Sequence, residues 1–149
     1  MLKTYIDGSF ISKIKTFGWA CVIVDDYDKV VRVEYGYSSE LKYAKSWNVA
    51  GELIASMKAI DYAISKGETD ICIYYDYMGI ECWATGEWKN RKGTPIVTEY
   101  IQFIKDRSKK IKIHFRKVAA HTGIANNELA DRLCRGAIQN RECGYKDYT

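Results

Sequence analysis

The sequence predicts a mixed α/β fold in which three antiparallel strands are followed by alternating helices and strands. Three early segments, 3–9, 17–24 and 29–37, alternate as strands do and are rich in β-branched and aromatic residues. Short connections between them favour an antiparallel meander. Two later strands, 69–75 and 112–119, each follow a helical segment, so we expect parallel pairing there by right-handed crossover.

The helices are predicted by a change of the apolar period to 3.6 residues. Four segments carry this period: 48–66, 78–85, 95–109 and 126–140. The first has an apolar stripe and, beside it, a flank of small residues formed by Ser56, Ala59 and Ala63. This flank would let the helix approach a sheet closely. The expected order is three strands, a helix, a strand, two helices, a strand and a helix.

Length and composition indicate one globular domain. The 149 residues are 47% hydrophobic and 28% charged, and no apolar run approaches the roughly 18 residues that a membrane span needs. We expect the domain over residues 1–140 and a frayed tail over 141–149. The start of the chain lacks the apolar region of a secretory signal, which predicts a cytoplasmic location. The net charge of +4 permits an anionic partner without requiring one.

The five cysteines form no C-x-x-C pair, and this spacing argues against a disulfide framework and against a zinc site. Cys21 and Cys72 lie in apolar strands and are expected in the core, whereas Cys143 is expected to be an exposed thiol. His114 alternates within a strand and is expected to be structural. His121 lies in a Thr-Gly loop, where a titrating imidazole could serve a reaction.

Four carboxylates lie at informative positions. Asp7 is in the middle of the first strand, Glu52 is in the first turn of the long helix, and Asp76 ends the fourth strand. Asp131 borders the apolar stripe of the last helix. Each has an ordinary structural explanation as a turn residue, a dipole partner, a cap or a solvated side chain, and each alone favours that explanation.

Together, the four carboxylates favour a metal site. Gathered at one edge of a sheet, they would repel each other by several kcal/mol without a counter-charge. Mg²⁺ is held by a few carboxylates and keeps open positions for phosphate oxygens and water. Two such ions, roughly 3.5–4 Å apart, can activate a water and stabilise the leaving oxygen of a phosphodiester. The pattern therefore predicts a metal-dependent nuclease.

The chain resembles a known family, type 1 ribonuclease H, from Thr4 to about Ala137. The resemblance rests on YIDGS, NVAGEL, IYYD and VAAHTGIANNELAD, which occur in the family's order. The stretch YYDYMGIECWATGEWK resembles the bacterial group whose members often carry a viroplasmin-like N-terminal module. The resemblance implies the RNase H-like fold: a five-stranded mixed sheet in the order βββαβαβα with helices on both faces.

The resemblance also implies an activity: endonucleolytic hydrolysis of the RNA strand of RNA–DNA hybrids, leaving 5′-phosphate and 3′-hydroxyl ends. Two Mg²⁺ ions, which Mn²⁺ could replace, would be held by Asp7, Glu52, Asp76 and Asp131. Asp7 would bridge the ions, Asp131 would be the weaker ligand, and Glu52 would also touch a ribose 2′-hydroxyl. His121 matches a loop histidine that assists proton movement or product release.

Substrate contacts are expected around these carboxylates and on one basic, aromatic stretch. Asn48 matches an asparagine that contacts the hybrid in the minor groove. The other expected contacts are Gly8, Ser9, Asn127, Trp88 and Lys89. Trp83 could belong to the same surface or pack in the core, and both alternatives stay open. The chain departs from the family at FISKIKTFG, where a glycine-rich turn is common, and at Tyr77, where serine is usual.

Two alternative functions remain open. One is another nuclease of the same fold that acts on DNA, of the integrase, transposase or resolvase type. The other is a non-catalytic hybrid-binding module, in which we would expect a carboxylate to be missing. The expected partner is an RNA–DNA hybrid, with no membrane and no obligate protein partner, and the chain is expected to be monomeric.

Overall fold

The computed structural model describes residues 1–118 and 125–148. Its strands are β1 Leu2–Ile11, β2 Thr16–Val24, β3 Val30–Ser38, β4 Asp70–Tyr75, β5 Lys112–Lys117 and β6 Gly144–Asp147. Its α-helices are α1 Trp47–Ser65, α2 Gly79–Thr85, α3 Pro95–Arg107 and α4 Ala125–Asn140. Two 3-10 helices, η1 Ser12–Ile14 and η2 Leu41–Ser46, complete the described elements. Every expected strand and helix is present, although the expected end of the strand at residue 119 lies outside the described residues.

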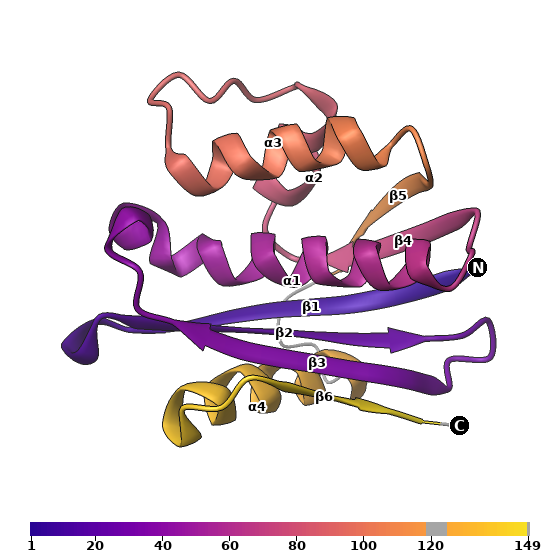
Figure 1. Ribbon diagram of the computed structural model, residues 1–149, viewed down its shortest axis with the longest axis horizontal. Helices are drawn as coiled ribbons and strands as arrows, with labels where there is room; N and C mark the ends of the chain where they lie inside the picture. Colours follow the sequence, from indigo (N-terminus) through magenta and orange to yellow (C-terminus); the bar gives the residue numbers. More distant parts are fainter. Residues whose placement is uncertain (119–124, 149) are drawn as a thin grey trace.

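The strands form a single mixed sheet in the order β5-β4-β1-β2-β3-β6. The pairs β1–β2 and β2–β3 are antiparallel, whereas β1–β4 and β4–β5 are parallel. Helices α1, α2 and α3 lie on one face of this sheet and α4 lies on the other (Figure 1). The predicted α/β fold class, with a meander followed by crossover connections, is therefore confirmed.

The sheet has six strands, so the prediction of five is wrong. Residues of β6 pair antiparallel with β3, from Arg32 opposite Asp147 to Tyr35 opposite Gly144. The Arg32 guanidinium donates to Asp147 at 2.9 Å and lies 4.1 Å from the centre of the Tyr145 ring. The short polar segment GYKD has no apolar alternation that would reveal it as a strand. The prediction of a frayed tail is therefore wrong for β6. The expected domain boundary at residue 140 stays a prediction.

Two apolar layers hold the helices to the sheet. On one face, α1 and α3 cover a core that includes Ile6, Leu53 and Ile60. On the other, α4 covers a smaller cluster around Tyr5, Val22, Val24, Val33 and Ala130. Cys21 and Cys72 are buried and Cys143 is exposed, as predicted. Among the described residues, no helix is both long and apolar enough to cross a membrane.

The small-residue flank of α1 lies deep against the sheet, as predicted, because Ser56, Ala59 and Ala63 are fully buried. Two glycines then bring backbones together at one point. A Cβ at Gly51 would lie 2.3 Å from the carbonyl oxygen of Gly18 on β2. A Cβ at Gly18 would lie 2.3 Å from the carbonyl oxygen of Cys134 on α4. Helices on both faces thus approach the same short segment of sheet.

Substitution of Gly51 by alanine is expected to destabilise the fold. The added Cβ would meet a backbone carbonyl that cannot move without shifting β2, so we expect a loss of about 1–3 kcal/mol. The matched control is Gly136→Ala in α4, where an added Cβ meets nothing within 4 Å. That control should gain about 0.5–1 kcal/mol from helix propensity. Urea unfolding measures both values, and a neutral Gly51→Ala variant would refute the close-approach argument.

Candidate active site at the end of strands β1 and β4

The chain adds strands to the sheet in opposite directions on the two sides of the β1–β4 pair. The chain leaves β1 toward β2 on one side, whereas β4 leads by way of α2 and α3 to β5 on the other. Ligands of open α/β sheets bind at the carboxyl ends of strands at such a switch point. Regular pairing of β1 with β4 ends at Tyr5 opposite Tyr74, so Asp7 and Asp76 each lie two residues beyond it. Parallel strands therefore bring both aspartates to the same place.

Glu52 lies over this point from α1. Its side chain is buried, with 7% of the residue exposed, and it shares a hydrogen bond with Asp76. Burial, reinforced by this hydrogen bond and by the negative charges of Asp76 and Asp7, raises the pKa of the Glu52 carboxyl to about 9. Glu52 and Asp76 are thus close enough to share a proton, with the charge of Asp7 nearby, and a divalent cation could take the place of that proton.

Asp131 approaches Asp7 from the other face of the sheet, on α4. One ligand atom each from Asp7, Asp131 and Cys134 lie within 4.8 Å of one another. Asp131 also accepts a hydrogen bond from Arg135 at 2.8 Å, one turn along the helix. Asp7 therefore stands between two acidic groups: Glu52 with Asp76, and Asp131.

Cys134 is a neighbour of the site and belongs to the buried face of α4. Its Sγ donates to the backbone carbonyl of Asp131 at 3.2 Å, and burial raises the pKa of this thiol. A protonated thiol is a poor metal ligand, because metal ions bind the thiolate. Any cation held here would be bound by the oxygens of Asp7 and Asp131. In the sequence, the spacing of three residues on one helix indicates that Cys134 lies close to Asp131.

The expected substrate contacts next to Asp7 have clear places in the structure. The backbone N–H of Gly8 donates to Asp7 Oδ1 at 2.8 Å. A Cβ at Gly8 would lie 2.9 Å from the backbone nitrogen of Glu52, so this glycine also lets α1 approach. Ser9 is half-buried on β1, opposite Gly18 on β2. These positions are compatible with substrate contact, which stays a prediction.

The other predicted contacts are spread more widely. Asn127 is buried at 8% exposure in the first turn of α4, one turn before Asp131. Trp88 is exposed at 39% and Lys89 is exposed beside it, in the connection between α2 and α3. Trp83 is half-buried and packs against the core, and its part in a substrate surface stays a prediction. The predicted roles of His121 and of the Asn48 side chain lie outside the described residues.

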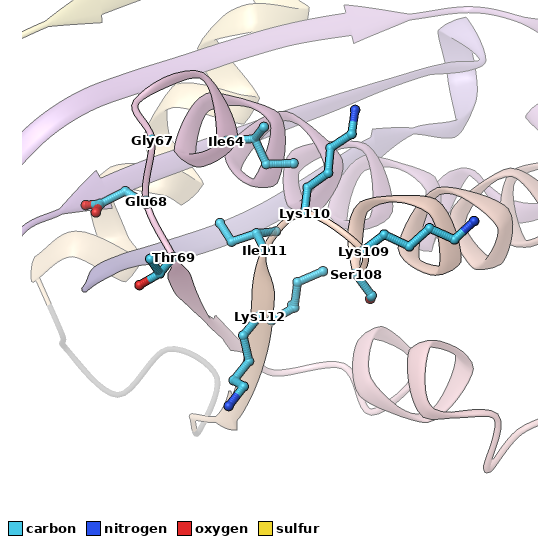
Figure 2. Close-up of a pocket in the computed structure, with 10 residues that line it drawn as sticks. Ile64, Gly67, Glu68, Thr69, Ser108, Lys109, Lys110, Ile111 and Lys112 are labelled. Atoms are coloured by element: carbon cyan, nitrogen blue, oxygen red, sulfur yellow. The ribbon is translucent and has the colours of Figure 1, made fainter.

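The opposite end of the sheet has features that do not belong to this cluster. His114 Nε2 lies 2.7 Å from Asp70 Oδ2, and this contact, the main cause, lowers the pKa of Asp70. The pair supports the structural role predicted for His114. An open pocket of about 680 Å³ lies at the amino-terminal ends of β4 and β5, lined by residues such as Thr69, Lys110 and Ile111 (Figure 2). None of the predicted site residues that the structure describes lines it.

Solved structures with the same architecture identify the fold. RNase H1 of the archaeon Halobacterium salinarum matches with a TM-score of 0.76 over 93% of this chain and 98% of its own, at 20% identity. LC11-RNase H1, solved in complex with an RNA/DNA hybrid, matches with a TM-score of 0.77 over 95% of this chain and 99% of its own, at 18% identity. At these identities the likeness concerns the fold, which is RNase H-like.

Sequence comparison then shows the family. The family model described as RNase H matches residues 1–139. The ribonuclease H of Neorickettsia sennetsu is 27% identical over 88% of this chain and 88% of its own. The chain belongs to the RNase H family, and it is a hydrolytic ribonuclease. The resemblance to type 1 ribonuclease H is confirmed, while its link to the group with a viroplasmin-like module stays a prediction.

Proposed function

We propose that this protein cleaves the RNA strand of RNA–DNA hybrids endonucleolytically and leaves 5′-phosphate and 3′-hydroxyl ends. The observation that carries the proposal is the acidic cluster around Asp7. It has Glu52 and Asp76 on one side and Asp131 on the other. The hybrid bound to the structurally similar LC11-RNase H1 supports the choice of substrate.

The donor set of this cluster fits hard divalent cations. All four proposed ligands offer carboxylate oxygens, which Mg²⁺ prefers, and they come from elements on both faces of the sheet. Two ions would be held here, one by Asp7 with Glu52 and Asp76 and one by Asp7 with Asp131, and Mn²⁺ is the expected substitute for Mg²⁺. When bound, such ions supply an activated water and stabilise the leaving oxygen.

The chain's own residues hold these ligands in place before substrate arrives. The Gly8 N–H orients the Asp7 carboxylate, and the packing of α1 against β1 and β2 fixes Glu52. Asp131 is less constrained, because its partner Arg135 is an exposed side chain and exposed ion pairs contribute little. We therefore propose that Asp131, which already lies close to Asp7, exchanges its contact with Arg135 for a cation in the active state. His121 is the proposed group for proton movement near the scissile phosphate.

The proposed substrate surface extends from Gly8 and Ser9, with Asn48 and Asn127, to Trp88 and Lys89. Glu52 is the proposed contact to a ribose 2′-hydroxyl, the group that distinguishes RNA from DNA. Trp88 offers an exposed ring for stacking, and Lys89 offers a positive charge for the phosphate backbone.

Trp88→Ala is expected to raise the KM for a hybrid about tenfold and to change kcat little, because stacking on a ring far from the reacting atoms is uniform binding. Steady-state cleavage of a labelled hybrid measures both parameters. The control Trp88→Phe keeps a ring and should stay near wild type. A KM unchanged in Trp88→Ala would remove Trp88 from the substrate surface.

The substrate class is tested with three duplexes of one sequence: RNA–DNA hybrid, double-stranded DNA and double-stranded RNA, each labelled on either strand. We expect cleavage of the RNA strand of the hybrid alone. Cleavage of double-stranded DNA would favour the integrase or resolvase alternative. Binding of the hybrid without any cleavage would favour a non-catalytic module, although none of the four carboxylates is missing from the chain.

A further inference from the structure

Three aromatic rings immediately after Asp76 form a closed cluster, here called the aromatic triad: Tyr77, Trp83 and Trp88. The ring centres are 5.9 Å apart for Tyr77–Trp83, 6.2 Å for Tyr77–Trp88 and 5.6 Å for Trp83–Trp88. Interplanar angles of 60°, 69° and 79° are those of tilted and edge-to-face pairs, which aromatic rings favour. Each ring therefore supports the other two.

Tyr77 joins this triad to the acidic cluster. It follows Asp76 directly in the chain, is half-buried, and packs against the main core. Burial and, secondly, the negative charge of Glu52 raise the pKa of its hydroxyl. Tyr77 thus follows a proposed metal ligand directly in the chain, and its ring contacts two tryptophans.

The backbone of α2 contacts all three residues of the triad. A Cβ at Gly79 would lie 2.4 Å from Tyr77 Cε2 and 2.7 Å from Trp83 Cζ3, so only glycine lets both rings lie over this turn. The backbone N–H of Trp88 donates to the carbonyl of Cys82 at 3.0 Å. Trp88 is thereby fixed at its backbone by α2 and at its ring by Tyr77 and Trp83, although 39% of the residue is exposed.

We propose that Tyr77 is a positioning residue that fixes the exposed ring of Trp88 relative to the carboxylates around Asp76. This inference rests on the proposed function, in which Trp88 binds the hybrid. A ring held in its bound position loses less conformational freedom when the substrate arrives, and so it binds more tightly. Tyr77 acts through its ring and through Trp88, and it makes no contact of its own with the reacting atoms.

The first test measures binding of a fluorescently labelled hybrid in EDTA, where no cleavage occurs. Tyr77→Leu should weaken binding about five- to tenfold, and Gly79→Ala, which displaces the ring without removing it, should do the same. Tyr77→Phe should bind as wild type does. The matched control is Tyr62→Leu, a half-buried tyrosine of α1 that also packs against the main core and should not change binding.

The second test places Tyr77→Leu in the Trp88→Ala background, where it should weaken binding no further. Acrylamide should also quench tryptophan fluorescence more strongly in Tyr77→Leu than in Tyr62→Leu. The inference is overturned if Tyr77→Leu and Tyr62→Leu behave alike, or if Tyr77→Phe weakens binding as much as Tyr77→Leu. It is also overturned if Tyr77→Leu weakens binding in the Trp88→Ala background by as much as it does in wild type. Wild-type protein that neither binds nor cleaves the hybrid would instead refute the proposed function.

Discussion

Asp76→Asn is expected to lower kcat for hybrid cleavage on the order of a thousandfold, because it removes one of the charged oxygens proposed to hold a catalytic cation. Asparagine has nearly the same shape, so the hydrogen bond with Glu52 can persist and the fold should be retained. Binding of the hybrid without metal should be unchanged or tighter, since one negative charge near the phosphates is lost. Single-turnover cleavage of a labelled hybrid measures the loss.

The matched control for this variant lies on the same strand. Asp70→Asn makes the same chemical change at the opposite end of β4, where Asp70 pairs with His114. It should leave the cleavage rate within about twofold of wild type, since exposed pairs are worth little. Equal rates in wild type and Asp76→Asn would remove Asp76 from the proposed metal ligands.

Glu52→Gln should abolish most cleavage and, in the same protein, remove a pH dependence of stability. The Glu52 carboxyl has a pKa of about 9 in the metal-free fold against an ordinary value of 4.5. Between these values the folded state binds more protons than the unfolded state, so the free energy of unfolding decreases as pH rises through that window. Glutamine does not titrate, so the variant should lose this slope and be more stable than wild type near neutral pH and above.

Urea unfolding in EDTA at about pH 5, 7 and 9 separates the two proteins. Mg²⁺ should stabilise wild type increasingly as pH rises, because the cation replaces the proton that Glu52 otherwise keeps. The glutamine variant should show a smaller metal effect. Parallel stability curves for wild type and Glu52→Gln, with and without Mg²⁺, would contradict this account of the buried carboxyl.

Most of the fold could be predicted from hydrophobic pattern, because α1 carries an apolar stripe and the central strands β2 and β4 are mostly apolar and buried. The strand β6 could not, because its residues are mostly exposed and polar. What makes it a strand is its pairing with β3 and the ion pair of Arg32 with Asp147, neither of which a local pattern contains. An edge strand of this kind depends on tertiary contacts more than on its own composition.

The approximate place of the acidic residues could also be predicted, since parallel strands and a close-packed helix gather Asp7, Glu52 and Asp76. Their catalytic roles stay predictions. The sequence could not show that Cys134 lies beside Asp7, because that depends on the packing of α4 against β1. Nor could it show the aromatic triad, because that depends on the turn that brings Trp88 back to α2. The glycines that permit close approach look like ordinary strand or helix residues until their neighbours are known.

The most direct test of the central claim is the rate of RNA-strand cleavage in an RNA–DNA hybrid as Mg²⁺ is titrated into metal-free wild-type protein. The account predicts no cleavage in EDTA, a rate that rises with Mg²⁺, and RNA fragments that end in a 3′-hydroxyl. Cleavage at the same rate in EDTA, or cleavage of the DNA strand, would contradict it.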